Sequence, residues 1–148
     1  IANAGYRAID SCRMEKGYLY WSGDISPDYN PYEAGLGFCV ALEKGEFIGR
    51  EALAKIKAAG LTRKLCSFTI DGFAPLHGGE TILHGGKVVG STTSVGYGHT
   101  AAKTIAFGYL PIEITDQKEF VIEAFGKAYK ATRGPRCLYD AKMERLKA

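Results

Sequence analysis

Lys64-Leu-Cys-Ser-Phe-Thr-Ile70 decides the fold, because its side chains alternate as those of a β-strand do. The alternation gives two faces, made of Cys66, Phe68 and Ile70 on one side and Leu65, Ser67 and Thr69 on the other. No helical pattern interrupts the residues that follow. They contain five more candidate strands, at 81–83, 87–94, 104–110, 120–124 and 127–132. Gly85-Gly86 and Phe125-Gly126 are typical of hairpin turns. Short strands in this succession predict a small antiparallel β-barrel or sandwich.

The residues before this stretch predict mainly helices. A first helix is expected over 3–16 and ends at Gly17, since glycine commonly stops a helix. An amphipathic second helix is expected over 49–59, with Gly60 as its cap. Between the two helices, a strand is expected at 36–42.

The change from helical to strand patterns near 60–62 predicts a domain boundary. Residues 1–61 would form the end of one domain and residues 62–148 a barrel domain, so the fold class is α+β. A chain of 148 residues with 46% hydrophobic and 24% charged residues is typical of a globular protein of one domain or two small ones.

The start of the chain predicts a piece of a longer polypeptide. Ile1 takes the place of an initiator methionine, and residues 5–16 already have a helical pattern. The charged residues Arg7, Asp10 and Arg13 interrupt the opening segment, so no signal peptide is expected. Apolar runs stay below the length of about 18 residues that spans a bilayer, so no membrane partner is expected.

Four widely separated cysteines predict thiols and not a metal site. They share no metal-ligand or redox spacing with one another or with the histidines, and they are Cys12, Cys39, Cys66 and Cys137. Reduced thiols are typical of an intracellular protein. We therefore expect a cytoplasmic location, or the mitochondrial matrix if the protein is eukaryotic.

The net charge of +3 is unevenly distributed. Residues 1–60 hold seven Lys/Arg against eight Asp/Glu, and residues 61–148 hold twelve against eight, giving −1 and +4. A basic end can attract nucleic acid, a phosphate or a polycarboxylate, or it can be a solvated tail. RNA binding ranks low, because Lys130, Arg133 and Arg136 lie mostly outside the strand alternation that an RNA-binding sheet face uses.

Three groups of motifs resemble one known family. They are Asp10-Ser-Cys-Arg-Met-Glu-Lys-Gly-Tyr-Leu-Tyr-Trp-Ser-Gly-Asp-Ile25 followed by Asn30-Pro-Tyr-Glu-Ala-Gly-Leu-Gly37, Phe47-Ile-Gly-Arg-Glu-Ala-Leu53, and Gly90-Ser-Thr-Thr-Ser94 followed by Gly96-Tyr-Gly-His-Thr100 and Lys103-Thr-Ile-Ala-Phe-Gly-Tyr-Leu-Pro111. In this order they resemble the folate-binding aminomethyltransferases, whose founding member is the glycine cleavage T-protein. Trp-Ser-Gly-Asp-Ile and Tyr-Gly-His-Thr look most like the C-terminal parts of sarcosine and dimethylglycine dehydrogenases.

The resemblance implies a ring of three modules with folate near its centre, to which residues 1–61 contribute the end of the folate-binding module. It implies a tetrahydrofolate-dependent enzyme that transfers a one-carbon unit from a methylated amine or an aminomethyl carrier protein. In the dehydrogenases an FAD module comes earlier. The family's catalytic Asp lies in the N-terminal half, so no catalytic residue is assigned here and the chain alone should be inactive. A non-catalytic regulatory or interaction module with the same fold is the alternative.

The resemblance also implies folate contacts near the first helix. Arg13 takes the place of the family's helix arginine, although it could simply pair with Asp10 at i, i+3, a bridge of about 0.3–0.5 kcal/mol. Glu15 is expected either to contact the ligand or to be a structural partner. Tyr20 and Trp21 could form walls for the pterin or belong to the core.

Two further pairs complete the predicted site. Tyr97 and His99, expected in a glycine-flanked loop, would lie near the folate centre. Tyr139 and Arg145 match the family's closing Tyr and Arg, and Arg145 would bind the anionic glutamate tail unless this terminus is frayed. The other histidines, His77 and His84, match no motif and are expected in surface loops.

Overall fold

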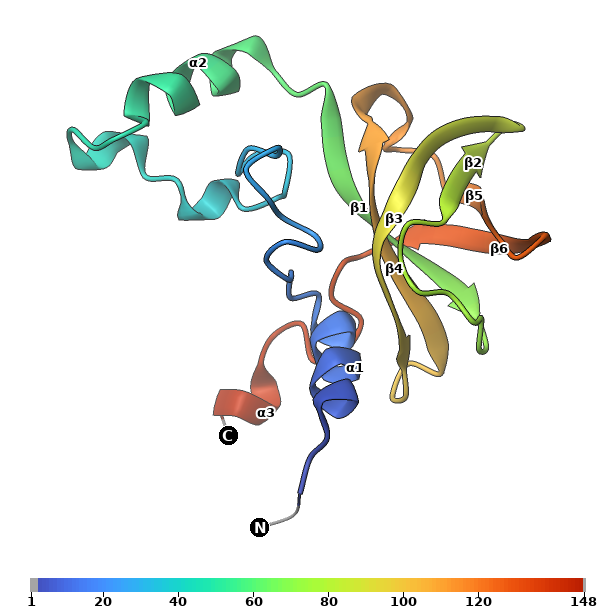
Figure 1. Ribbon diagram of the computed structural model, residues 1–148. Coiled ribbons are helices and arrows are strands. Elements are labelled where there is room, and N and C mark those ends of the chain that lie inside the picture. Colours follow the sequence, from blue (N-terminus) through green and yellow to red (C-terminus); the bar gives the residue numbers. More distant parts are fainter. Residues whose placement is uncertain (1–2, 148) are drawn as a thin grey trace.

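Six antiparallel strands close into a barrel in the order β1-β4-β3-β2-β5-β6 (Figure 1). The computed structural model describes residues 3–147. The strands are β1 Arg63–Asp71, β2 Thr81–His84, β3 Lys87–Gly98, β4 Lys103–Pro111, β5 Glu119–Ala124 and β6 Lys127–Gly134. Gly85-Gly86 and Phe125-Gly126 connect hairpins, and all four residues have positive φ, which suits the turns of two-residue hairpins. Every predicted strand after residue 60 is therefore confirmed. Of the two predicted architectures, barrel and sandwich, the structure has the barrel.

The barrel interior holds the larger hydrophobic core. The predicted inner face of β1 is confirmed, because Cys66, Phe68 and Ile70 are all buried in this core. Phe68 meets Phe120 of β5 edge to face at 5.3 Å. Because the sheet is closed, the barrel has no free strand edge.

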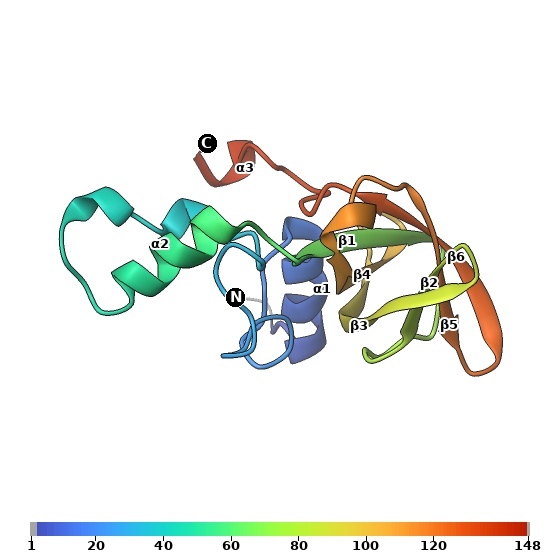
Figure 2. The same ribbon diagram turned by 90° about the horizontal axis from the view of Figure 1, so that it is seen from above.

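Helix α1 (Tyr6–Lys16) lies against the outside of the barrel, along β3 and β4 (Figures 1 and 2). Met14 of α1 is fully buried in a second hydrophobic cluster with residues of β1 and β4, which are Leu65, Ile105, Phe107 and Tyr109. The helix begins three residues later than expected. It ends at the predicted Gly17, whose left-handed conformation has φ 76°.

Strand β3 extends to Gly98, four residues beyond the predicted end at 94. The added part contains two glycines that lie against α1. A Cβ at Gly96 would lie 3.0 Å from Met14, and one at Gly98 would lie 2.9 Å from Glu15. Glycine weakens a strand pattern in the sequence. Here it permits the close approach of a helix.

Residues 37–60 form an arm that extends from the barrel (Figures 1 and 2). The predicted strand at 36–42 is wrong, since the arm contains the 3₁₀ turns η1 Gly37–Cys39 and η2 Leu42–Lys44 instead. A closed barrel offers this segment no edge with which to pair. The predicted second helix is confirmed as α2 (Arg50–Ala59), in which no residue is buried.

Two short elements complete the chain, η3 Ile112–Ile114 and α3 Glu144–Lys147. None of the helices within residues 3–147 has the length and apolarity needed to cross a bilayer. The domain division near residue 61 stays a prediction.

Candidate functional site

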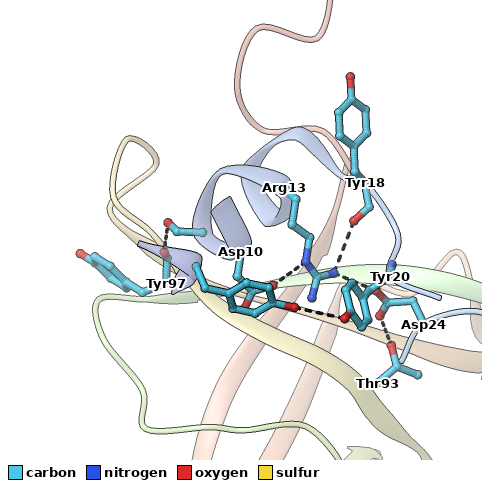
Figure 3. Close-up of polar contacts among 9 residues, drawn as sticks. Asp10, Arg13, Tyr18, Tyr20, Asp24, Thr93 and Tyr97 are labelled. Carbon is cyan, nitrogen blue, oxygen red and sulfur yellow. Dashed lines mark hydrogen bonds and ion pairs between the residues drawn. The ribbon is translucent and has the colours of Figure 1, made fainter. Parts of the chain in front are cut away.

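Arg13 is the centre of a polar cluster that joins α1 to the segment after it (Figure 3). Its Nε donates to Asp10 Oδ1 at 2.7 Å, so the pair that helical spacing suggested is present. Its Nη1 donates to Asp24 Oδ2 at 2.8 Å and, more weakly, to the Tyr18 carbonyl at 3.4 Å. The side chain is 16% exposed. Two carboxylates therefore hold the guanidinium plane in one orientation.

Asp24 is the buried member of this cluster, with a side chain that is 0% exposed. Besides the Arg13 bond, its Oδ2 accepts the Tyr20 N–H at 2.9 Å, and its Oδ1 accepts the Thr93 hydroxyl at 2.6 Å. Burying a carboxylate is costly unless a cation and hydrogen bonds compensate for the lost water. Asp24 has both kinds of partner.

The third guanidinium nitrogen of Arg13, Nη2, makes no hydrogen bond to any residue in the range 3–147. The cluster of Asp10, Arg13 and Asp24 carries a formal charge of −1, so Arg13 is not a free cation. A guanidinium in this state suits a neutral acceptor, such as a ring carbonyl or ring nitrogen, better than it suits a carboxylate.

An aromatic side chain lies beside Arg13. The Tyr20 ring lies 5.7 Å from the Arg13 guanidinium carbon, and its hydroxyl lies 3.1 Å from the Tyr6 hydroxyl. Tyr20 is 50% exposed and Trp21 is 64% exposed. The alternative that Tyr20 and Trp21 belong to the core is therefore wrong. Both rings are exposed, and the Tyr20 ring lies beside a fixed hydrogen-bond donor.

Glu15 projects to another side of α1 and is buried. Its Oε1 accepts the backbone N–H groups of Thr100 and Ala101, at 2.6 and 2.8 Å. Its backbone carbonyl accepts the N–H groups of Leu138 and Tyr139, at 2.8 and 3.2 Å. These bonds make Glu15 a structural partner that joins the β3–β4 turn and the C-terminal segment to α1. A ligand contact by Glu15 stays a prediction.

Tyr97 and His99 lie at one end of the barrel. The expected loop position is correct for His99 but wrong for Tyr97, which belongs to β3. The two rings meet edge to face at 5.1 Å. They line a cleft of about 330 Å³ together with Phe73, His77 and, from α1, Arg7 and Asp10. Since Asp10 also binds Arg13, this cleft adjoins the Arg13 cluster.

The remaining histidine lies elsewhere. His84 is part of β2, so its expected loop position is wrong, and its Nδ1 lies 3.0 Å from the Glu119 carbonyl.

Tyr139 and Arg145 are paired at the other end of α1. Arg145 Nη1 donates to the Tyr139 hydroxyl at 2.5 Å, and the neighbouring Asp140 forms an ion pair with Lys16 at 3.2 Å. Hydrogen bonding to Tyr139 raises the pKa of the exposed Arg145 guanidinium, so it stays charged. No bond within residues 3–147 joins this pair to the Arg13 cluster, so the predicted site residues fall into two groups.

Thr93 was missed by sequence reasoning, although it completes the hydrogen bonding of Asp24. The only sequence signal was the hydroxyl-rich run Ser91-Thr-Thr-Ser94. A strand pattern gives the face on which a residue lies but does not identify a partner 69 residues away in the chain.

Comparison with known proteins agrees with the fold. Residues 63–140 match the model of the glycine cleavage T-protein C-terminal barrel domain, and residues 1–44 match that of the GCVT N-terminal domain. The crystal structure of glycine cleavage system aminomethyltransferase T from Bartonella henselae superposes with a TM-score of 0.79 and 28% identity, covering 86% of this chain and 37% of that one.

Two curated relatives match at higher identity. Mitochondrial sarcosine dehydrogenase of Mus musculus is 40% identical over 99% of this chain, and mitochondrial dimethylglycine dehydrogenase of Homo sapiens is 42% identical over 88%. The chain spans only 17% and 16% of their lengths. These matches confirm the resemblance found in the motifs. The chain belongs to the glycine cleavage T-protein family, whose C-terminal barrel domain it contains.

Proposed function

We propose that this chain forms one part of the tetrahydrofolate site of a longer one-carbon-transfer enzyme, of the aminomethyltransferase or the sarcosine/dimethylglycine dehydrogenase type. The observation that carries the proposal is the fixed guanidinium of Arg13 beside the exposed ring of Tyr20, which is followed in the chain by the exposed Trp21. A site for a flat, hydrogen-bonding ring needs a directed donor and aromatic walls, and this surface offers both.

The charge of the Arg13 cluster supports an assignment to the pterin end of folate. Because Asp10 and Asp24 neutralise the guanidinium, Nη2 would donate to a neutral ring acceptor. The anionic glutamate tail needs a cation without a carboxylate partner. Arg145 is exposed and donates to the neutral Tyr139 hydroxyl, so we assign the tail to this pair.

The cleft that contains Tyr97 and His99 adjoins Arg13 through Asp10 and has an aromatic lining. We propose that it receives part of the same ligand. Glu15 would then act indirectly, because its carboxylate holds the turn that follows His99.

Bound tetrahydrofolate would supply the N5 atom that accepts the one-carbon unit. The residues described here bind and orient this ligand, and none of them is assigned the proton transfer. The donor would be a small methylated amine or an aminomethyl group on a carrier protein. In an enzyme of the dehydrogenase type, FAD would bind elsewhere in the longer protein. A cytoplasmic or mitochondrial-matrix location would suit such an enzyme.

The basic residues give little support to the RNA-binding alternative. Arg136 donates to the Ala34 carbonyl at 3.2 Å, and the Nε of Arg133 is buried. Lys130 and Arg133 lie in β6, so their expected position outside the strand alternation is wrong. Of the three residues only Lys130 is an exposed cation, which is fewer than a phosphate-binding surface uses.

The proposal is tested by calorimetric titration of the natural polypeptide containing this chain with tetrahydrofolate, under reducing conditions. We expect saturable binding that weakens at least about tenfold, or 1.4 kcal/mol, in Arg13→Ala. Arg50→Ala, in α2 and with its side chain bonded to Leu42 and Glu46 of the arm, is the control and should weaken binding less. If the wild type does not bind, the folate assignment fails, and the non-catalytic interaction module becomes the better explanation.

A further inference from the structure

We propose that Thr93 is a positioning residue for Arg13, which it orients through Asp24. This inference rests on the folate site proposed above. It concerns how the barrel, which supplies none of the groups assigned to the pterin end, controls the geometry of that end.

The contacts form a single chain from β3 to the ligand surface (Figure 3). The Thr93 hydroxyl donates to Asp24 Oδ1 at 2.6 Å, and Asp24 Oδ2 accepts from Arg13 Nη1 at 2.8 Å. The two oxygens of one carboxylate thus have different partners, one in the barrel and one on α1. Because the Asp24 side chain is inaccessible to solvent, water does not replace either bond.

The backbone at Asp24 is fixed by the next strand. The Tyr109 hydroxyl of β4 donates to the Asp24 carbonyl at 3.0 Å, and both groups are buried. The Tyr109 ring also stacks on Tyr29 of the same loop, with centroids 3.8 Å apart. Asp24 therefore has its main chain tied to β4 and its side chain tied to β3, so the rigid barrel sets its position.

Threonine suits this role because its branched Cβ restricts χ1 and keeps the hydroxyl directed. Valine at this position would keep the shape of the side chain but leave Asp24 Oδ1 without its donor. The carboxylate would then be free to reorient, and Arg13 would lose the alignment of its Nη1 bond. Serine would keep the donor.

The test measures the tetrahydrofolate dissociation constant of the natural polypeptide as the wild type and in three variants. We expect Thr93→Val to weaken binding about tenfold, the equivalent of 1.4 kcal/mol, and Thr93→Ser to restore it to within about twofold of the wild type. Thr69→Val is the matched control, since Thr69 donates to the Thr132 carbonyl at 3.5 Å and does not contact Asp24. It should bind like the wild type.

A double-mutant cycle separates positioning from general destabilisation. If Thr93 acts through Arg13, then Thr93→Val should weaken binding no further in an Arg13→Ala background. Equal weakening in both backgrounds would overturn the inference, as would wild-type affinity of Thr93→Val. A wild type without folate affinity would overturn the proposed function, and the positioning role with it. Melting temperatures show whether each variant is folded, and Thr93→Ser keeps the test decisive if Thr93→Val is not.

Discussion

The two longer helices, α1 and α2, are nearly equal in length but differ in what surrounds them. Helix α1 buries Met14 and Glu15 against the barrel and the C-terminal segment, whereas α2 buries no residue. The apolar pattern in the sequence was nevertheless clearer for α2. The difference shows that amphipathic periodicity predicts a helix without identifying what it packs on. The anchoring of α1 depends on one buried methionine, on glycines in the facing strand and on polar bonds.

Among the substitutions that compare α1 with α2, Met14→Ala is expected to have the largest effect. Met14 is fully buried in the cluster beneath α1, so its truncation should cost about 2–5 kcal/mol of unfolding free energy. Leu53→Ala on the half-buried face of α2 is the matched change and should cost less than about 1.5 kcal/mol. Urea unfolding of the purified chain measures both values. Similar losses at the two positions would contradict the difference between the helices.

A smaller effect is expected from Glu15→Gln. The substitution keeps an acceptor for the Thr100 and Ala101 N–H groups but removes its charge, and hydrogen bonds to charged groups are the stronger ones. We expect a loss of about 1–2 kcal/mol in urea unfolding. Glu51→Gln, on an exposed position in the first turn of α2, should cost about 0.5 kcal/mol. A neutral outcome for Glu15→Gln would show that its bonds do not anchor α1.

The smallest effect is expected in the pH dependence of stability, where a carboxyl of the barrel is compared with a carboxyl of the arm. Burial raises the pKa of the Glu80 carboxyl, but bonds from the His77 and Gly78 N–H groups and the Thr92 hydroxyl outweigh burial and hold this pKa below its ordinary value. A carboxyl with a lowered pKa stabilises the fold when ionised, and this stability is lost as the pH falls through the folded-state value.

Glu80→Gln should therefore reduce the loss of stability between about pH 6 and about pH 3, measured by thermal unfolding. Glu43→Gln, at an exposed position of η2 in the arm, is the control and should leave this loss unchanged. If the two variants lose the same stability over this range, the bonds to Glu80 have no net effect on folding.

Much of the fold was predictable, because β-strand alternation and glycine-containing turns are local signals. Residues 64–70 gave the inner face of β1, and Phe125-Gly126 gave a hairpin. The predicted strand at 36–42 was wrong because a strand also needs a partner, and the closed barrel provides no free edge. The end of β3 was missed because glycines in the sequence did not reveal the helix that packs on them.

The candidate site was less predictable, because its contacts join distant parts of the chain. Arg13 and its partner Asp10 lie one helical turn apart, so their ion pair could be foreseen. The bonds of Asp24 to Thr93 and of Glu15 to Thr100 join residues 69 and 85 positions apart in the chain, and no local pattern encodes them. The folate roles of Arg13, Tyr20, Trp21 and the other candidate residues remain predictions.

Hydrogen–deuterium exchange of the natural polypeptide, with and without saturating tetrahydrofolate, tests most directly whether the α1 region is the ligand surface. Binding stabilises the regions that the ligand contacts, so their amides exchange more slowly. We predict slower exchange in residues 10–25 and unchanged exchange in residues 50–59 of α2. Saturable folate binding without protection of residues 10–25 would contradict the assignment of the site to Arg13 and its aromatic neighbours.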